Sequence, residues 1–121
     1  MKDIFSVSVE FVGPFVDEFI NEGILVFFGQ DAPKELKEFS IIWNFSGYER
    51  PIEAGDLLHI NDQTFKILGV GEIANKNLND LGHLIIKFNG ETETRLPGDV
   101  NVEHKPIPSI AKGTSIRVKG K

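Results

Sequence analysis

The chain of 121 residues has no cysteine, which excludes disulfides, thiolate nucleophiles and thiolate metal sites and suits a reducing cytoplasm. Its formal net charge is -5, and basic residues cluster only near the end of the chain, so we expect no nucleic-acid partner. A chain of this length can bury one compact core, and we expect a single domain over residues 1–121.

The N-terminal segment has the pattern of a strand and not of a targeting signal. Apolar and polar residues alternate from Ile4 to Phe11, the period of a half-buried strand, until Gly13 and Pro14 break the pattern. A basic segment followed by a long apolar run and a cleavage site is missing, so we expect no signal peptide. The longest apolar runs are far too short to span a bilayer, so we expect no membrane insertion and a cytoplasmic location.

Short strand-like segments separated by turn residues dominate the rest of the chain. Residues 61–63 form a polar connection typical of a hairpin. Asp31 is placed to cap a short helix that has Pro33 in its first turn, and Gly82 is placed to end a later one. The expected strands are residues 1–10, 24–28, 39–45, 57–60, 64–70, 83–88, 100–102 and 115–118, and the expected helical turns are residues 15–20, 32–38 and 75–81.

These elements predict an all-β fold, either a small barrel-like domain or a sandwich, made of mainly antiparallel strands with one or two short helices. Residues 90–108 could cross the end of the barrel or exchange with a neighbouring molecule, so a homo-oligomer stays open. Gly69 and Gly71 match neither a dinucleotide fingerprint, which needs a third glycine, nor a P-loop. We therefore expect this glycine pair to mark a bulge or a close backbone approach.

Two of the three histidines are predicted to have no part in chemistry. Strand alternation places His59 opposite Leu58 and Ile60, toward solvent, and His104 lies beside a charge pair in an exposed loop. The three histidines have no short ligand spacing and no accompanying thiolates, so we expect no metal site and no cofactor.

His83 is the strongest candidate for chemistry. It follows Gly82 at a helix-to-strand corner, where side chains are often half exposed and a partner's backbone can approach. The imidazole could instead fix this corner by hydrogen-bonding a backbone carbonyl, or shape a docking surface, and these alternatives stay open. Lys87 is the nearest cation on the same strand face, but at about 3.3 Å per residue it lies roughly 13 Å away, so we assign it no catalytic role.

A family resemblance rests on the stretch from Gly69 to Gly90, GVGEIANKNLNDLGHLIIKFNG, which carries the pattern V-G-x-(I/V)-A-x-x-N-L-x-x-L-G-H followed by an amphipathic strand ending F-x-G. Further matching positions are Gly13, Ala32-Pro33, Gly55 and Leu96-Pro97-Gly98. On these residues most of the chain resembles the glucitol/sorbitol-specific IIA component of the bacterial phosphoenolpyruvate-dependent sugar phosphotransferase system. The resemblance implies a barrel-like cytoplasmic protein with minor helices.

The resemblance also implies partners and a reaction. In that family a histidine receives phosphate from the general phosphocarrier protein and passes it to membrane permease components, without metal or organic cofactor. In this register the acceptor position falls on Trp43. Indole cannot replace imidazole, because its nitrogen only donates a hydrogen bond and its lone pair belongs to the aromatic ring.

Trp43 therefore leaves three interpretations of function. The chain relays phosphate in sugar uptake as its family does, it relays phosphate with the acceptor moved to His83, or it is a phosphorylation-incompetent binding or regulatory module that keeps the docking surface. We expect Trp43 to be a core residue that also fills the pocket where the family's phosphohistidine would lie.

Overall fold

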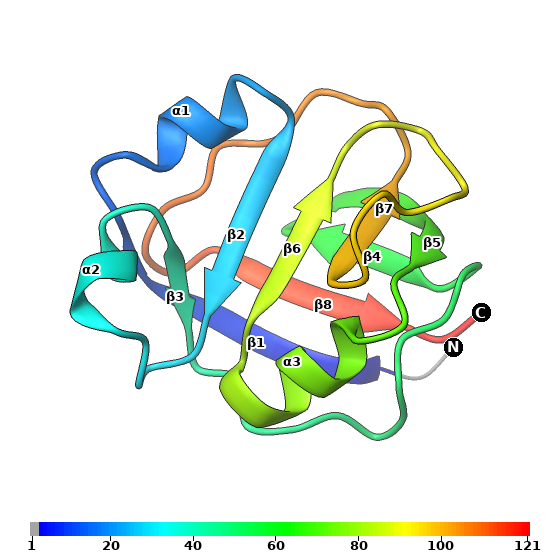
Figure 1. Cartoon of the computed structure of the whole chain (residues 1–121), viewed down its shortest axis with the longest axis horizontal. Coiled ribbons are helices and arrows are strands. Elements are labelled where there is room, and N and C mark those ends of the chain that lie inside the picture. Colours follow the sequence, from blue (N-terminus) through cyan, green and yellow to red (C-terminus); the bar gives the residue numbers. More distant parts are fainter. Residues whose placement is uncertain (1–2) are drawn as a thin grey trace.

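The computed structural model describes residues 3–121, which form a closed barrel of eight strands (Figure 1). The order around the barrel is β1-β3-β2-β6-β7-β5-β4-β8. Six neighbouring pairs are antiparallel, and the pairs β2/β3 and β6/β7 are parallel. The elements are β1 (Asp3–Val12), α1 (Val16–Ile20), β2 (Ile24–Phe28), α2 (Lys34–Lys37), β3 (Ile41–Trp43), β4 (Leu57–Ile60), β5 (Gln63–Val70), α3 (Ala74–Leu81), β6 (Leu84–Lys87), β7 (Asp99–Val102) and β8 (Ser115–Lys119).

The predicted all-β, mainly antiparallel class is confirmed, with three short helices in place of one or two. Figure 1 shows α1 and α2 beside the wall made by β2 and β3, whereas α3 lies at the end of the barrel where β6 begins. None of the helices within residues 3–121 is long and apolar enough to cross a membrane.

Two local predictions on the crossover from β2 to β3 were wrong. Asp31 does not cap α2, since Pro33 occupies the N-cap position and no side chain bonds to the helix start. The predicted strand over residues 39–45 is shorter and spans only Ile41–Trp43, because the chain is still turning at Ser40, whose hydroxyl donates to the carbonyl of Leu36 over 2.6 Å. Local turn geometry thus decided where α2 ends and β3 begins.

Strand alternation places the core inside the barrel, as the period-two pattern predicted. In β6, Leu84 and Ile86 point inward and are buried, while Ile85 and Lys87 are half-buried on the outer face. β1 and β8 repeat the same alternation. His83 directly precedes β6, and this register places it on the outer side of the barrel, in line with Ile85.

The glycine pair at the end of β5, with Gly69 in the strand and Gly71 just after it, marks both a bulge and a close approach, as predicted. The β5/β7 register shifts between Ile67 and Gly69. A Cβ on Gly69 would lie 2.3 Å from the carbonyl oxygen of Thr92, and one on Gly71 would lie 2.1 Å from that of Pro97. The segment between β6 and β7 therefore lies against the end of β5 and the residue after it, at two points where only hydrogen fits.

Candidate functional site

Trp43 is a core residue, as the sequence predicted. Its side chain is 0% exposed, and its ring stacks on Phe27 with centroids 4.2 Å apart. The ring of Phe5 lies nearly perpendicular to it, with the two centroids 5.7 Å apart. The indole N–H donates to the carbonyl of Gly82 over 2.8 Å. Position 43 therefore presents no lone pair and no solvent-accessible atom for phosphate.

The corner at Gly82 is built by close backbone packing. α3 ends where Gly82 adopts φ 63°, and the N–H groups of Gly82 and His83 donate to the carbonyls of Leu78 and Asn77. A Cβ on Gly82 would lie 2.9 Å from the backbone of Gly29, so a larger residue could not occupy this position. This packing joins the end of β2 to the start of β6 and sets the direction of the His83 side chain.

His83 is half-buried and oriented by two neighbours in β2. Its Nδ1 lies 3.1 Å from the carbonyl oxygen of Phe27, and its ring stacks on Phe28 with centroids 4.1 Å apart and an interplanar angle of 19°. A carbonyl only accepts hydrogen bonds, so Nδ1 carries the hydrogen and Nε2 keeps its lone pair. Nε2 has no partner within residues 3–121 and is not among the side-chain atoms sealed from solvent.

An apolar cavity of about 370 Å³, here called the His83 pocket, opens beside this ring. Its lining residues come from α1, β2, the α2 region and the β6 corner, and they include no aspartate, glutamate, lysine or arginine. They are Phe19, Val26, Phe28, Leu36, Phe39, Ser40 and His83. A phosphoryl group on His83 would find no fixed cation in this lining.

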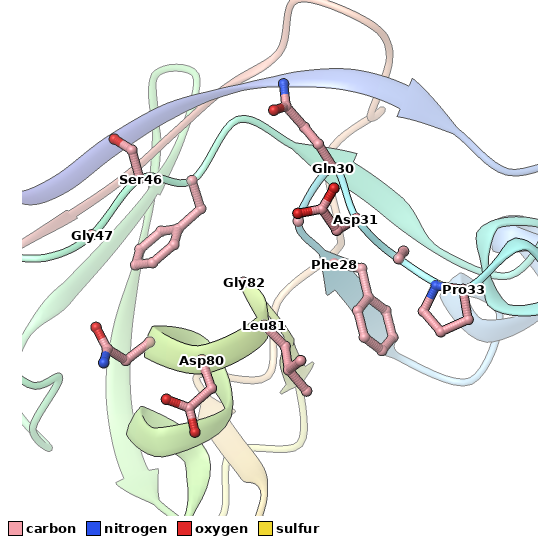
Figure 2. A pocket seen from close by; sticks show the side chains of 13 residues that line it. Phe28, Gln30, Asp31, Pro33, Ser46, Gly47, Asp80, Leu81 and Gly82 are labelled. Atoms are coloured by element: carbon pink, nitrogen blue, oxygen red, sulfur yellow. The ribbon is translucent and has the colours of Figure 1, made fainter.

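A second cavity of about 390 Å³ lies beyond the end of α3 and is polar (Figure 2). Asp31 and Asp80 contribute carboxylates to it, and its polar lining is completed by Gln30, Ser46 and Asn79. Its lining contains no lysine or arginine that could bind a phosphate group. Neither cavity is lined by Trp43, so Trp43 and His83 do not share an exposed pocket.

The other candidate residues are accounted for by local contacts. Lys87 pairs with the buried carboxylate of Asp99, with Nζ 2.8 Å from Oδ2, which leaves its charge away from His83. His104 lies in an exposed bend, as predicted. His59 lies on the face of β4 opposite Leu58 and Ile60, as predicted, but the expected exposure was wrong, because the residue is half-buried. Its Nδ1 lies 3.2 Å from the hydroxyl of Thr64, and its Nε2 is enclosed without a partner among residues 3–121.

Phe28 was not predicted to be part of the site. The run Ile24–Phe28 indicated a strand buried on both faces. Two adjacent phenylalanines in a strand must point to opposite faces, however, so Phe28 had to leave the core that Phe27 enters. That signal was available in the sequence, although it could not identify the ring on which Phe28 stacks.

Comparisons with known proteins agree on one family. The profile of the family described as "PTS system glucitol/sorbitol-specific IIA component" matches residues 4–117. The glucitol/sorbitol-specific EIIA components of Shigella flexneri and Escherichia coli (strain K12) are each 26% identical over 118 residues, which cover 97% of this chain and 95% of theirs. The crystal structure of a PTS system IIA component from Enterococcus faecalis V583 has a TM-score of 0.82 at 25% identity and covers 96% of this chain and 100% of its own.

Proposed function

Because this chain belongs to the family of glucitol/sorbitol-specific IIA components of the sugar phosphotransferase system, we propose that it relays phosphate in the cytoplasm from the general phosphocarrier protein to a membrane permease component. The sugar would resemble glucitol or sorbitol, as the names of its relatives indicate. Trp43 cannot carry the phosphate, so the relay needs another acceptor.

The acceptor in this proposal is Nε2 of His83. The observation that carries it is the contact between Nδ1 and the carbonyl of Phe27, which leaves Nε2 as the nucleophilic nitrogen of a neutral imidazole. Stacking on Phe28 holds the ring in one orientation, so that little freedom is lost when a donor arrives.

The transfer conserves atoms and charge without a cofactor. The lone pair on Nε2 attacks phosphorus of the donor's phosphohistidine, and the donor's N–P bond breaks as its electron pair returns to the donor ring. A donor ring that is protonated on its other nitrogen leaves as neutral imidazole. The new phosphohistidine keeps its Nδ1 hydrogen on the carbonyl of Phe27, and transfer to the permease component reverses these events.

The second candidate is a binding or regulatory module that docks to the same partners and accepts no phosphate. The uncharged lining of the His83 pocket favours it, because a transferring phosphoryl group is stabilised by cations or N–H groups. In this case the contact with the Phe27 carbonyl would serve only to fix the corner.

Intact-mass measurement after incubation with phosphoenolpyruvate and the two general phosphotransfer proteins separates the candidates. The relay predicts one acid-labile phosphate on the wild type, lost in His83→Ala and kept in His104→Ala, the matched exposed-histidine control. No phosphate on the wild type, with a gain in Trp43→His, would establish the docking module. Equal phosphorylation of the wild type and His83→Ala would place the acceptor elsewhere.

A further inference from the structure

Three large apolar side chains remain exposed beside the His83 pocket. Phe15 is 42% exposed, Leu36 42% and Phe39 38%. Phe15 stacks on Phe39 at 5.3 Å, and Phe19 meets Phe39 edge-on at 6.0 Å, so the aromatic rings form one cluster. We call the surface made by Phe15, Phe19, Leu36, Phe39 and His83 the His83 face.

Residues 3–121 leave this surface open to solvent. α2 has only four residues and buries none of them, so it contributes nothing to the core of the barrel. Its apolar residue, Leu36, lines the His83 pocket from the outside. An apolar surface next to a cavity and a half-buried histidine is the composition of a protein-binding site.

The helices that frame the His83 face carry more acid than base. Exposed acidic side chains are contributed by Asp17 and Glu18 of α1 and by Glu35 and Glu38 at α2. Opposing them are two lysines of α2, Lys34 and Lys37. A partner whose rim carries lysine and arginine is attracted to these acidic side chains. A second copy of the chain would place its own acidic side chains against them, and the like charges would repel.

Phosphate transfer to His83 is also favoured by a partner that carries basic groups. The His83 pocket supplies no fixed cation, whereas the charge on a phosphoryl group in transfer is stabilised by cations or N–H groups. We infer that the His83 face is the docking site of the phosphate donor, a protein surface with an apolar centre and a basic rim, and that the donor brings the cations this pocket lacks. This inference rests on the proposed relay and adds the surface and the chemistry of its partner.

Calorimetric titration with the unphosphorylated general phosphocarrier protein tests the surface separately from the relay. Leu36→Glu places a charge in the apolar centre and should weaken binding by about tenfold or more. The matched control is Leu96→Glu, because Leu96 is 57% exposed but lies outside the His83 pocket, and its binding should equal that of the wild type. No binding by the wild type, or equal weakening in both variants, would overturn the inference.

Charge reversal tests the rim. Glu18→Lys together with Glu35→Lys should weaken binding several-fold and reduce its dependence on salt, while circular dichroism stays unchanged since both side chains are exposed. Unchanged affinity and salt dependence would overturn the basic-rim partner. A wild-type dimer in sedimentation that Leu36→Glu dissolves would show instead that a second copy occupies this face.

The relay and the docking site can fail separately. Binding that depends on Leu36 without phosphate on His83 would keep the docking site and reject the relay. Phosphate on His83 with unaltered phosphorylation and binding in Leu36→Glu would keep the relay and reject the docking site.

Discussion

The indole N–H of Trp43 donates to the carbonyl of Gly82 over 2.8 Å, so Trp43 is hydrogen-bonded to the residue that immediately precedes His83. Trp43 lies inside the barrel and His83 on its outer side. One corner of the backbone therefore separates a buried indole without an available lone pair from an imidazole with an unpaired ring nitrogen. Substitution of Trp43 should therefore alter the position of the His83 ring, because it removes this hydrogen bond to Gly82.

Trp43→Phe should lower the free energy of unfolding by about 2 to 4 kcal/mol. The change leaves a cavity in the core and deprives the buried Gly82 carbonyl of its donor. Urea unfolding measures the effect, and Leu96→Ala, an exposed change, should stay within about 0.5 kcal/mol of the wild type. A Trp43→Phe variant as stable as the wild type would contradict the importance of this bond.

Long-range ¹H–¹⁵N spectra of neutral imidazoles should show that His83 is protonated on Nδ1 and unprotonated on Nε2. The Phe27 carbonyl selects this tautomer because it can only accept a hydrogen bond. His104, exposed and without this contact, is the internal reference and should show a tautomer mixture. A hydrogen on Nε2 of His83 would remove the chemical basis of the relay.

Acid should release the stabilisation that Asp56 provides. Burial alone would raise the pKa of this carboxyl, but the Arg50 guanidinium and the backbone N–H groups of Glu53 and Lys121 outweigh it and hold the pKa below its ordinary value. Because the folded pKa is depressed, the stabilisation is complete above the unfolded pKa of about 3.8 and disappears as pH falls through the folded value.

Asp56→Asn is the variant that checks this dependence. Removing the charge weakens the hydrogen bonds from Arg50, Glu53 and Lys121 and should cost about 2 kcal/mol of unfolding free energy at pH 7. The loss should begin to shrink as pH falls below about 3.8 and should disappear below the folded pKa, where the wild-type carboxyl is protonated as well. A loss that is equal at pH 7 and pH 3 would contradict the assignment.

His59 should make the protein less stable as pH falls from 8 to 5. Burial lowers the pKa of His59, and Arg117 and Lys119 lower it further against a smaller opposing effect of Asp3. The unfolded chain therefore binds the proton first, and stability begins to fall near the ordinary pKa of 6.5 and stops falling below the folded value. Thermal midpoints across this range should decline less in His59→Gln than in the wild type, and parallel curves would exclude His59 as the cause.

Gly71→Ala should displace the segment between β6 and β7. The new Cβ would lie 2.1 Å from the carbonyl oxygen of Pro97, so the backbone at residue 71 and the backbone at Pro97 must move apart. We expect a loss of about 1 to 3 kcal/mol in unfolding free energy and faster amide hydrogen exchange over residues 91–98. Unchanged exchange in this segment would mean that the contact with β5 does not hold it.

Much of the fold could be predicted because it depends on local patterns. The limits of β2 and β4 follow from apolar runs bounded by turn residues, and the end of α3 follows from Gly82. The short β3 and the missing Asp31 cap could not be predicted, since they depend on how the crossover between β2 and β3 folds back. The exposure of His59 was wrongly predicted because alternation gives the face of a strand and not what covers that face.

The sequence by itself determined the family, the barrel class and the absence of an acceptor lone pair at position 43, because these depend on residue identity and spacing. Only the tertiary structure decided which nitrogen of His83 is free, since that depends on a carbonyl 56 positions away in the chain. It also decided that Leu36 and Phe39 lie beside His83, because β6 pairs with β2 and the crossover from β2 to β3, which carries both residues, lines the same cavity as β2. Residues that are distant in the sequence become neighbours only when the barrel closes, so local sequence patterns cannot predict these contacts.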